Sequence, residues 1–97
     1  MTEKNKEMCH KIADHYGEEH QMLKAVEEMA ELSQAILKLR NYENSYHDYL
    51  KELADVTIMI GQLKYFNYKS GNYGLLEMYI NEKLDRQLKR MEDENDA

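Results

Sequence analysis

Two pairs of acidic residues have the types and the spacing that could hold a metal ion. Glu28 and Glu31 form the first pair, and Glu52 and Asp55 form the second. In each pair the acids are three positions apart, so on a helix both lie on the same face. If the two helices faced each other, four carboxylates would surround a small space, and carboxylate oxygens are the ligands by which proteins hold a hard divalent cation.

Four ionised carboxylates brought together in this way would repel one another. Two unit charges 4 Å apart cost about 4 kcal/mol at an effective dielectric constant of 20, so either protons or a divalent cation must relieve the cluster. Ligation by oxygen alone points to Mg²⁺, with Mn²⁺ as the alternative. Zinc would want histidine or cysteine ligands, and a di-iron bundle would want Glu-x-x-His on two helices. A carboxylate-held Mg²⁺ suits phosphate chemistry, because it neutralises phosphate charge and lowers the pKa of a bound water.

The elements that must position these acids are helices. Hydrophobic periodicity, with Gly17 as a helix stop and a glycine-containing turn after residue 68, divides the chain into four helical segments and an acidic end. We expect helices over 2–16, 18–40, 46–68 and 75–91, and a frayed tail over 92–97.

The second and third of these segments differ in how many apolar residues surround the acids. Segment 18–40 has a broad apolar arc, with Glu28 at its edge. Segment 46–68 is apolar on almost every side, which is typical of a helix buried on most sides. Glu52 and Asp55 lie within segment 46–68, where lone buried carboxylates are costly unless they are paired or bound to metal. The predicted fold is therefore all-α, a small antiparallel bundle of about four helices.

Length and charge narrow the class of protein further. The chain has 97 residues, enough for one domain over 1–97 with a modest core that homo-oligomerisation would complete. The formal charge of −6, from 19 acidic and 13 basic residues, argues against duplex nucleic acid as a partner. Met1 to His10 does not resemble a signal peptide, and no apolar run could cross a membrane, so we expect a cytoplasmic protein without a membrane partner.

Each of these features also has a purely structural interpretation. Acids such as Glu27, Glu28 and Glu31 are common on solvated helix faces beside lysines, here Lys24 and Lys38. A buried ion pair with Lys51 or Lys64 would account for Glu52 and Asp55. Basic residues near the C-terminal end of a helix often interact only with the helix dipole.

The motifs taken in order, Glu-Glu-x-x-Glu at 27–31 followed by Glu-x-x-Asp at 52–55, resemble the signature of the all-α nucleoside triphosphate pyrophosphohydrolases, the MazG-like group. The resemblance covers roughly residues 18–91. It implies Mg²⁺-dependent cleavage of a nucleoside triphosphate between its α- and β-phosphates, giving the monophosphate and pyrophosphate. It also implies that Glu27 is an accessory acid, which orients water or joins a second metal, and that the metal ligands are Glu28, Glu31, Glu52 and Asp55.

The last predicted helix offers the groups that would balance the remaining phosphate charge. Lys83, Arg86 and Arg90 form a basic stripe at helical spacing. The resemblance implies that this stripe contacts substrate, with Gln87 at a position where the family often has asparagine. It also implies a homodimer or homotetramer, with the site completed near a subunit interface.

Two other functions fit the same features. The broad apolar faces would suit a non-catalytic helical module that dimerises or binds a partner helix. A phosphoribosyl-ATP pyrophosphohydrolase-like enzyme is the other alternative, because that family shares the fold implied by the resemblance.

Overall fold

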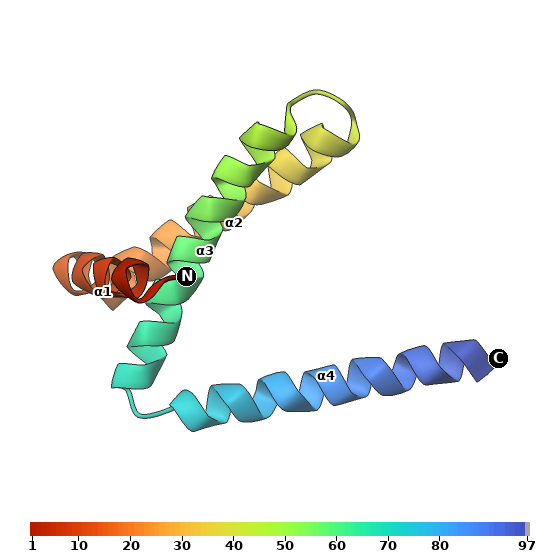
Figure 1. Ribbon diagram of the computed structural model, residues 1–97. Helices are drawn as coiled ribbons and strands as arrows, with labels where there is room; N and C mark the ends of the chain where they lie inside the picture. The colour runs from red at the N-terminus through yellow and green to blue at the C-terminus, as the bar shows by residue number, and fades with distance from the viewer. Residues whose placement is uncertain (97) are drawn as a thin grey trace. The chain divides into compact units, whose positions relative to one another are not determined.

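The computed structural model describes residues 1–96, apart from the side chains of Tyr73 and Asp96, and its regular elements are helices (Figure 1). No strand occurs within these residues, so the all-α fold class is confirmed. In chain order the helices are α1 (Glu3–Tyr16), α2 (Glu18–Arg40), α3 (Tyr46–Lys69) and α4 (Tyr73–Asp96).

The chain divides into two compact units. The first is Met1–Phe66, which holds α1, α2 and most of α3, and the second is Asn67–Ala97, which holds the end of α3 and α4. The single domain over 1–97 and the homo-oligomer stay predictions. In the described part of the chain, no helix has both the length and the apolar character that spanning a bilayer requires.

Local signals in the sequence set the ends of the first three helices. Thr2 caps α1, since its hydroxyl accepts a hydrogen bond from the Asn5 backbone N–H at 3.1 Å. Gly17 ends α1 with a φ of 88°, a left-handed conformation that favours glycine. At the start of α3, Ser45 and Asp48 cap each other: the Ser45 backbone N–H donates to the Asp48 carboxylate, and the Asp48 N–H donates to the Ser45 hydroxyl. The hydrogen bond from the Ser45 backbone lowers the pKa of Asp48.

The predicted bounds of the last helix were wrong at both ends. It begins at Tyr73, because the Asn72 carbonyl already accepts hydrogen bonds from the N–H groups of Leu75 and Leu76. It continues to Asp96, so residues 92–96 are helical, while Ala97 lies outside the described residues. The predicted end followed the last apolar residue, Met91. Backbone helicity instead persists because the polar residues beyond it include good helix formers and no glycine or proline.

Small side chains form much of the contact surface within the first unit. Cys9 and Ala13 of α1 and Ala25 and Ala35 of α2 are buried, together with the larger Met59 and Phe66 of α3. Gly61 leaves room for the Met1 side chain, since a Cβ atom there would lie 2.6 Å from Met1 Cε, whereas its distance of 3.5 Å from Cys9 Sγ would be an ordinary contact. Burial raises the pKa of the Cys9 thiol. The helices therefore approach one another through small residues.

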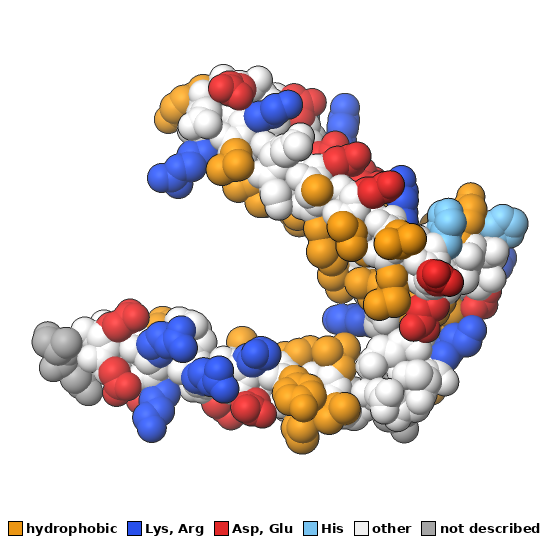
Figure 2. Space-filling model, turned by 180° about the vertical axis from the view of Figure 1, so that it is seen from behind, with side chains coloured by type: hydrophobic (Ala, Val, Ile, Leu, Met, Phe, Trp, Pro, Cys, Tyr) orange, Lys and Arg blue, Asp and Glu red, His pale blue; other side chains and the backbone are white. Residues whose placement is uncertain are grey.

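The large apolar side chains of the first unit are mostly exposed. Val26 of α2 remains 64% exposed and Ile58 of α3 39% exposed. Hydrophobic side chains accordingly gather in patches on the face seen in Figure 2. The expectation that the third helix is buried on most sides was wrong for the single chain, because its neighbours within the first unit cover only one side of it. The buried side of that helix carries Met59, Gln62 and Phe66.

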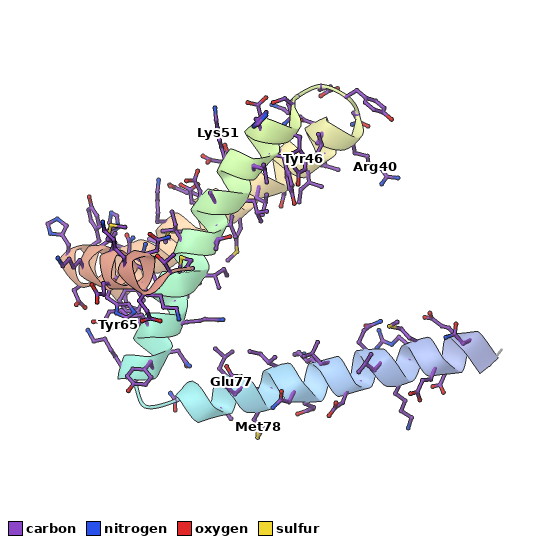
Figure 3. The ribbon with its side chains drawn as sticks, viewed as in Figure 1. Arg40, Tyr46, Lys51, Tyr65, Glu77 and Met78 are labelled. Carbon is purple, nitrogen blue, oxygen red and sulfur yellow. The ribbon has the colours of Figure 1, made fainter. Side chains whose placement is uncertain are left out.

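Polar and aromatic contacts hold α1 against α3. The Tyr65 hydroxyl donates to the Asp14 carboxylate, with oxygen–oxygen distances of 2.9 and 2.8 Å. Figure 3 shows Tyr65 beside α1. The His10 ring stacks on the Tyr65 ring with centroids 4.1 Å apart. These contacts hold the C-terminal part of α3 against α1.

Candidate metal centre

The α2–α3 hairpin brings the two acidic pairs to the same level. At one end, Gln21 Nε2 of α2 donates to Gln62 Oε1 of α3 at 2.7 Å. Near the connecting loop, the Asn44 side-chain amide donates to the Ala35 carbonyl at 3.3 Å. The helices run antiparallel between these contacts. A residue of α2 farther from the loop therefore lies opposite a residue of α3 that is also farther from the loop. Glu31 therefore lies near Glu52, and Glu28 near Asp55.

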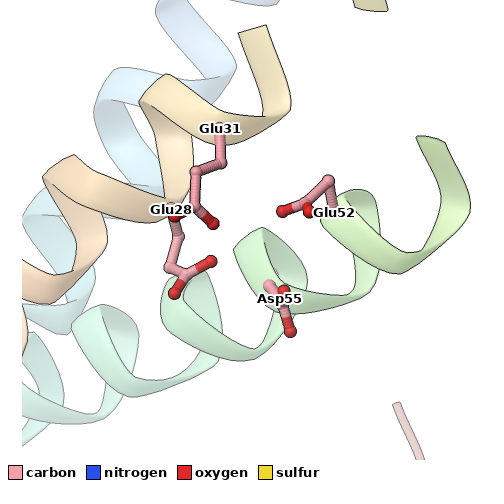
Figure 4. Close-up of side chains that lie close together, drawn as sticks. All are labelled: Glu28, Glu31, Glu52 and Asp55. Carbon is pink, nitrogen blue, oxygen red and sulfur yellow. The ribbon is translucent and has the colours of Figure 1, made fainter. Parts of the chain in front are cut away.

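The four acids form one cluster. One carboxylate oxygen from each of them can be chosen so that all four lie within 4.8 Å of one another. Figure 4 shows the α2 pair facing the α3 pair. The convergence that we predicted is thus a property of the fold, while the role of Glu28, Glu31, Glu52 and Asp55 as metal ligands stays a prediction.

Two oxygens of the cluster are buried without a hydrogen-bond partner. They are Glu28 Oε2, on a residue that is only 8% exposed, and Glu52 Oε2, on a half-buried residue. A buried polar atom normally has a partner, and leaving one unpaired costs free energy. A divalent cation would supply the missing partner for both oxygens. Glu31 and Asp55 are exposed, which leaves an open side for waters or a substrate. The donor set and its orphaned oxygens therefore fit Mg²⁺.

Mutual repulsion perturbs the cluster. The pKa of Glu31 is raised, first by the charge of Glu28, then by partial desolvation, then by the charge of Glu52. Lys24 relieves part of this repulsion, because its Nζ lies 3.2 Å from Glu28 Oε1. A hydrogen bond and the charge of Glu28 raise the pKa of Lys24, so it remains a cation at neutral pH. One lysine cannot neutralise four carboxylates, so an additional cation or a proton is favoured.

The purely structural interpretation of the second pair is not supported. Within the described residues, neither Lys51 nor Lys64 forms an ion pair with Glu52 or Asp55. Lys51 and Lys64 are exposed on other sides of the helix. The carboxylates of α3 therefore face those of α2, and lysine neighbours on their own helix do not account for them.

The remaining predicted site residues lie outside the cluster. Glu27 is exposed and pairs with Lys24 at 3.5 Å. On α4, the side chains of Lys83, Arg86, Gln87 and Arg90 are all exposed. Arg86 lies 3.8 Å from Glu82 of the same helix. Because α4 belongs to the second unit, contact between these four residues and a substrate at the cluster stays a prediction.

Sequence reasoning missed a pocket that continues from the cluster. A pocket of about 700 Å³ is lined by Glu28 and Asp55, and also by Gln21 and Gln62. The signal that could have revealed it is the spacing: Gln21 precedes Glu28 by two helical turns, and Gln62 follows Asp55 by two turns. Each glutamine thus shares a helix face with a candidate ligand.

The perturbed Glu31 leads to a prediction about acid. A carboxyl group whose pKa is higher in the folded state binds more protons when the protein is folded. The free energy of unfolding therefore rises as the pH falls from the raised pKa of Glu31 to the ordinary value of 4.5. We expect this contribution in metal-free protein and expect Glu31→Gln to remove it. Denaturation in EDTA across mildly acidic pH measures it. Identical pH profiles for both proteins would contradict the coupling.

Comparison with known proteins gives no relatives: no family model matches the chain, and neither the curated proteins nor the solved structures yield a match.

Proposed function

We propose that this chain is a Mg²⁺-dependent nucleoside triphosphate pyrophosphohydrolase of the MazG-like kind. The observation that carries the proposal is the approach of four carboxylates from α2 and α3 to within 4.8 Å, two of them with buried, unpartnered oxygens. Glu28 also pairs with Lys24 at 3.2 Å, but one lysine does not neutralise four carboxylates that face one another. The order of the two acidic motifs, which resembles that family, supports the same function.

The reaction is hydrolysis of a phosphoanhydride. Water adds to the α-phosphorus, the bond to the oxygen that bridges the α- and β-phosphates breaks, and pyrophosphate leaves with the bonding pair. The products are the nucleoside monophosphate and pyrophosphate. When bound, Mg²⁺ would neutralise phosphate charge and polarise the phosphorus–oxygen bond. Glu28, Glu31, Glu52 and Asp55 would hold it.

Other side chains of the first unit have roles that follow from their positions. Glu27 is exposed and lines the pocket beside Glu28, so it can orient the attacking water. Lys24 lines the same pocket and carries a positive charge within 3.2 Å of the cluster, so it can bind a phosphate oxygen. The basic stripe Lys83, Arg86 and Arg90, together with Gln87, would bind the leaving pyrophosphate.

Assembly into a homodimer or homotetramer is part of the same proposal. Large apolar side chains on α2 remain exposed in the single chain, including Leu23 at 66% and Val26 at 64%. Exposed apolar patches of this kind mark interaction surfaces. They equally favour the second candidate function, a non-catalytic dimerisation or partner-binding module, which would have no use for the unpartnered carboxylate oxygens.

Pyrophosphate release tests the proposal. The protein is incubated with Mg²⁺ and a panel of ribo- and deoxyribonucleoside triphosphates, and phosphoribosyl-ATP is included to test the histidine-pathway alternative. We expect stoichiometric pyrophosphate and monophosphate from at least one nucleotide, and no release in EDTA. Orthophosphate as the product would indicate cleavage at another bond. A folded protein that releases pyrophosphate from none of these compounds would leave the helical module as the function.

A further inference from the structure

The pocket beside the carboxylate cluster contains a buried pair of glutamines that the cluster chemistry does not use. Gln21 is 3% exposed and Gln62 is 1% exposed. Both line the pocket of about 700 Å³ that Glu28 and Asp55 also line. Each glutamine lies seven positions from the acid on its own helix, which is about 10 Å along the helix axis. A ligand with phosphates at the acids would therefore reach the glutamines with its other end.

A chain of hydrogen bonds from the His20 ring orients both amides, and the tautomer of His20 decides its direction. His20 Nδ1 lies 2.7 Å from Gln21 Oε1, and in the tautomer with a proton on Nδ1 the ring donates to this oxygen. The Gln21 amide nitrogen must then face Gln62, and it donates to Gln62 Oε1 at 2.7 Å. The Gln62 oxygen is thereby occupied, and its amide nitrogen is left to find another acceptor.

The Gln62 amide nitrogen lacks a good acceptor. In the described part of the chain its partner is the Met59 thioether at 4.0 Å, and thioether sulfur is a weak acceptor. A buried donor short of an acceptor is costly, so this atom is poised to donate to a ligand. Tyr16 and His20 line the same pocket with their rings stacked 4.9 Å apart, which offers a flat surface for a planar group.

We propose, on the basis of the function proposed above, that this pocket holds the nucleobase of the substrate and that Gln62 donates to an exocyclic carbonyl oxygen of that base. The enzyme would then prefer keto bases, such as uracil or guanine, over amino bases, such as cytosine or adenine. An amino group at that position would face the Gln62 amide donor to donor. Turning the Gln62 amide to accept would break its hydrogen bond from Gln21, whose orientation His20 sets.

His20 is a positioning residue in this scheme. It does not have to touch the base, because its Nδ1–H fixes the Gln21 amide, which in turn fixes the Gln62 amide. Without the imidazole, both amides could turn together and present an oxygen instead of a nitrogen. His20→Ala should therefore lower the preference between keto and amino bases more than it lowers turnover.

Two nucleotides whose pyrimidines differ at position 4, with the accompanying change of N3 from an N–H donor to an acceptor, test the proposal. We expect kcat/KM for pyrophosphate release to be at least tenfold higher with UTP than with CTP, because a site that is built to hydrogen-bond a group rejects the analogue that lacks it. Gln62→Met replaces the amide by an apolar chain of similar length and should reduce the ratio to about one. The double variant Gln21→Met/Gln62→Met leaves no amide of the pair unpaired, so it covers the case in which the single variant misfolds. His20→Ala should lower the ratio too, and His47→Ala, an exposed histidine on α3, is the matched control.

A binding experiment separates this inference from the hydrolase itself. ¹⁵N-labelled protein with Mg²⁺ is titrated with UMP or CMP, and the side-chain amide signals of Gln21 and Gln62 are followed. UMP should bind at least tenfold more tightly than CMP and should shift the Gln62 amide signals. Equal binding, unmoved Gln62 signals, or pyrophosphate release without a keto preference would overturn the inference alone. Selective UMP binding without pyrophosphate release would overturn the hydrolase and retain the base site. Absence of binding by either nucleotide would overturn the inference, and the pyrophosphate assay would decide the hydrolase separately.

Discussion

Replacing Glu31 by glutamine or Asp55 by asparagine is expected to reduce pyrophosphate release by about 100-fold or more. A bound divalent cation contributes several kcal/mol of charge stabilisation in phosphate chemistry, and every 1.36 kcal/mol corresponds to a factor of ten in rate. Each substitution keeps the size of the side chain and removes one negative ligand. The measurement is kcat/KM for pyrophosphate release at saturating Mg²⁺, for whichever nucleotide the wild-type protein hydrolyses.

The same substitutions should lower activity without lowering the stability of the folded protein. The pKa of Glu31 is raised by the neighbouring charge of Glu28, so removing the Glu31 charge relieves repulsion in the metal-free protein. We expect metal-free Glu31→Gln to be at least as stable to denaturant as the wild type. Glu19→Gln, which makes the same charge change at an exposed position of α2, is the matched control and should keep full activity. Full activity in both Glu31→Gln and Asp55→Asn would remove these residues from the site.

Adding Mg²⁺ to metal-free protein is expected to raise its melting temperature. A ligand that binds only the folded state at 100 times its Kd stabilises that state by about 2.7 kcal/mol. For a domain of this size, this corresponds to an increase in Tm on the order of 10 °C, since 1 kcal/mol shifts Tm by roughly 4–8 °C in a 60–100-residue domain. A thermal melt in EDTA, followed by a titration to millimolar Mg²⁺, measures the effect.

The stabilisation by Mg²⁺ should depend on the side chains of the carboxylate cluster and on pH. Glu28→Gln/Glu52→Gln replaces the two cluster carboxylates that have unpartnered buried oxygens by neutral amides, so the Mg²⁺-dependent rise in Tm should largely disappear. Protons compete with the cation for the carboxylates, so the rise should also shrink as the pH falls toward 4.5. A non-catalytic module without a metal site would show the same Tm with and without Mg²⁺, and this result would favour the module.

The sequence by itself was sufficient for the helices and for the two acidic pairs. Helix ends at Thr2 and Gly17 follow from capping chemistry that depends on a few neighbouring residues, and the same holds for the connection before Tyr46. The three-residue spacing within each acidic pair places its members on one helix face whatever the helix packs against. The end of α4 was predicted wrongly because the apolar stripe stops at Met91, whereas a helix continues as long as backbone propensity allows.

Only the tertiary structure decided what each helix face meets. Periodicity identified the apolar arc of α2 but could not tell that Ala25 and Ala35 are buried while Val26 remains exposed. It gave no reason to pair Gln21 with Gln62, which are far apart in the sequence and meet because the hairpin sets a register between α2 and α3. That same register places Glu28 and Glu31 opposite Glu52 and Asp55. Which residues face each other depends on how two helices pack in three dimensions. The pattern of residues along one helix does not determine that packing.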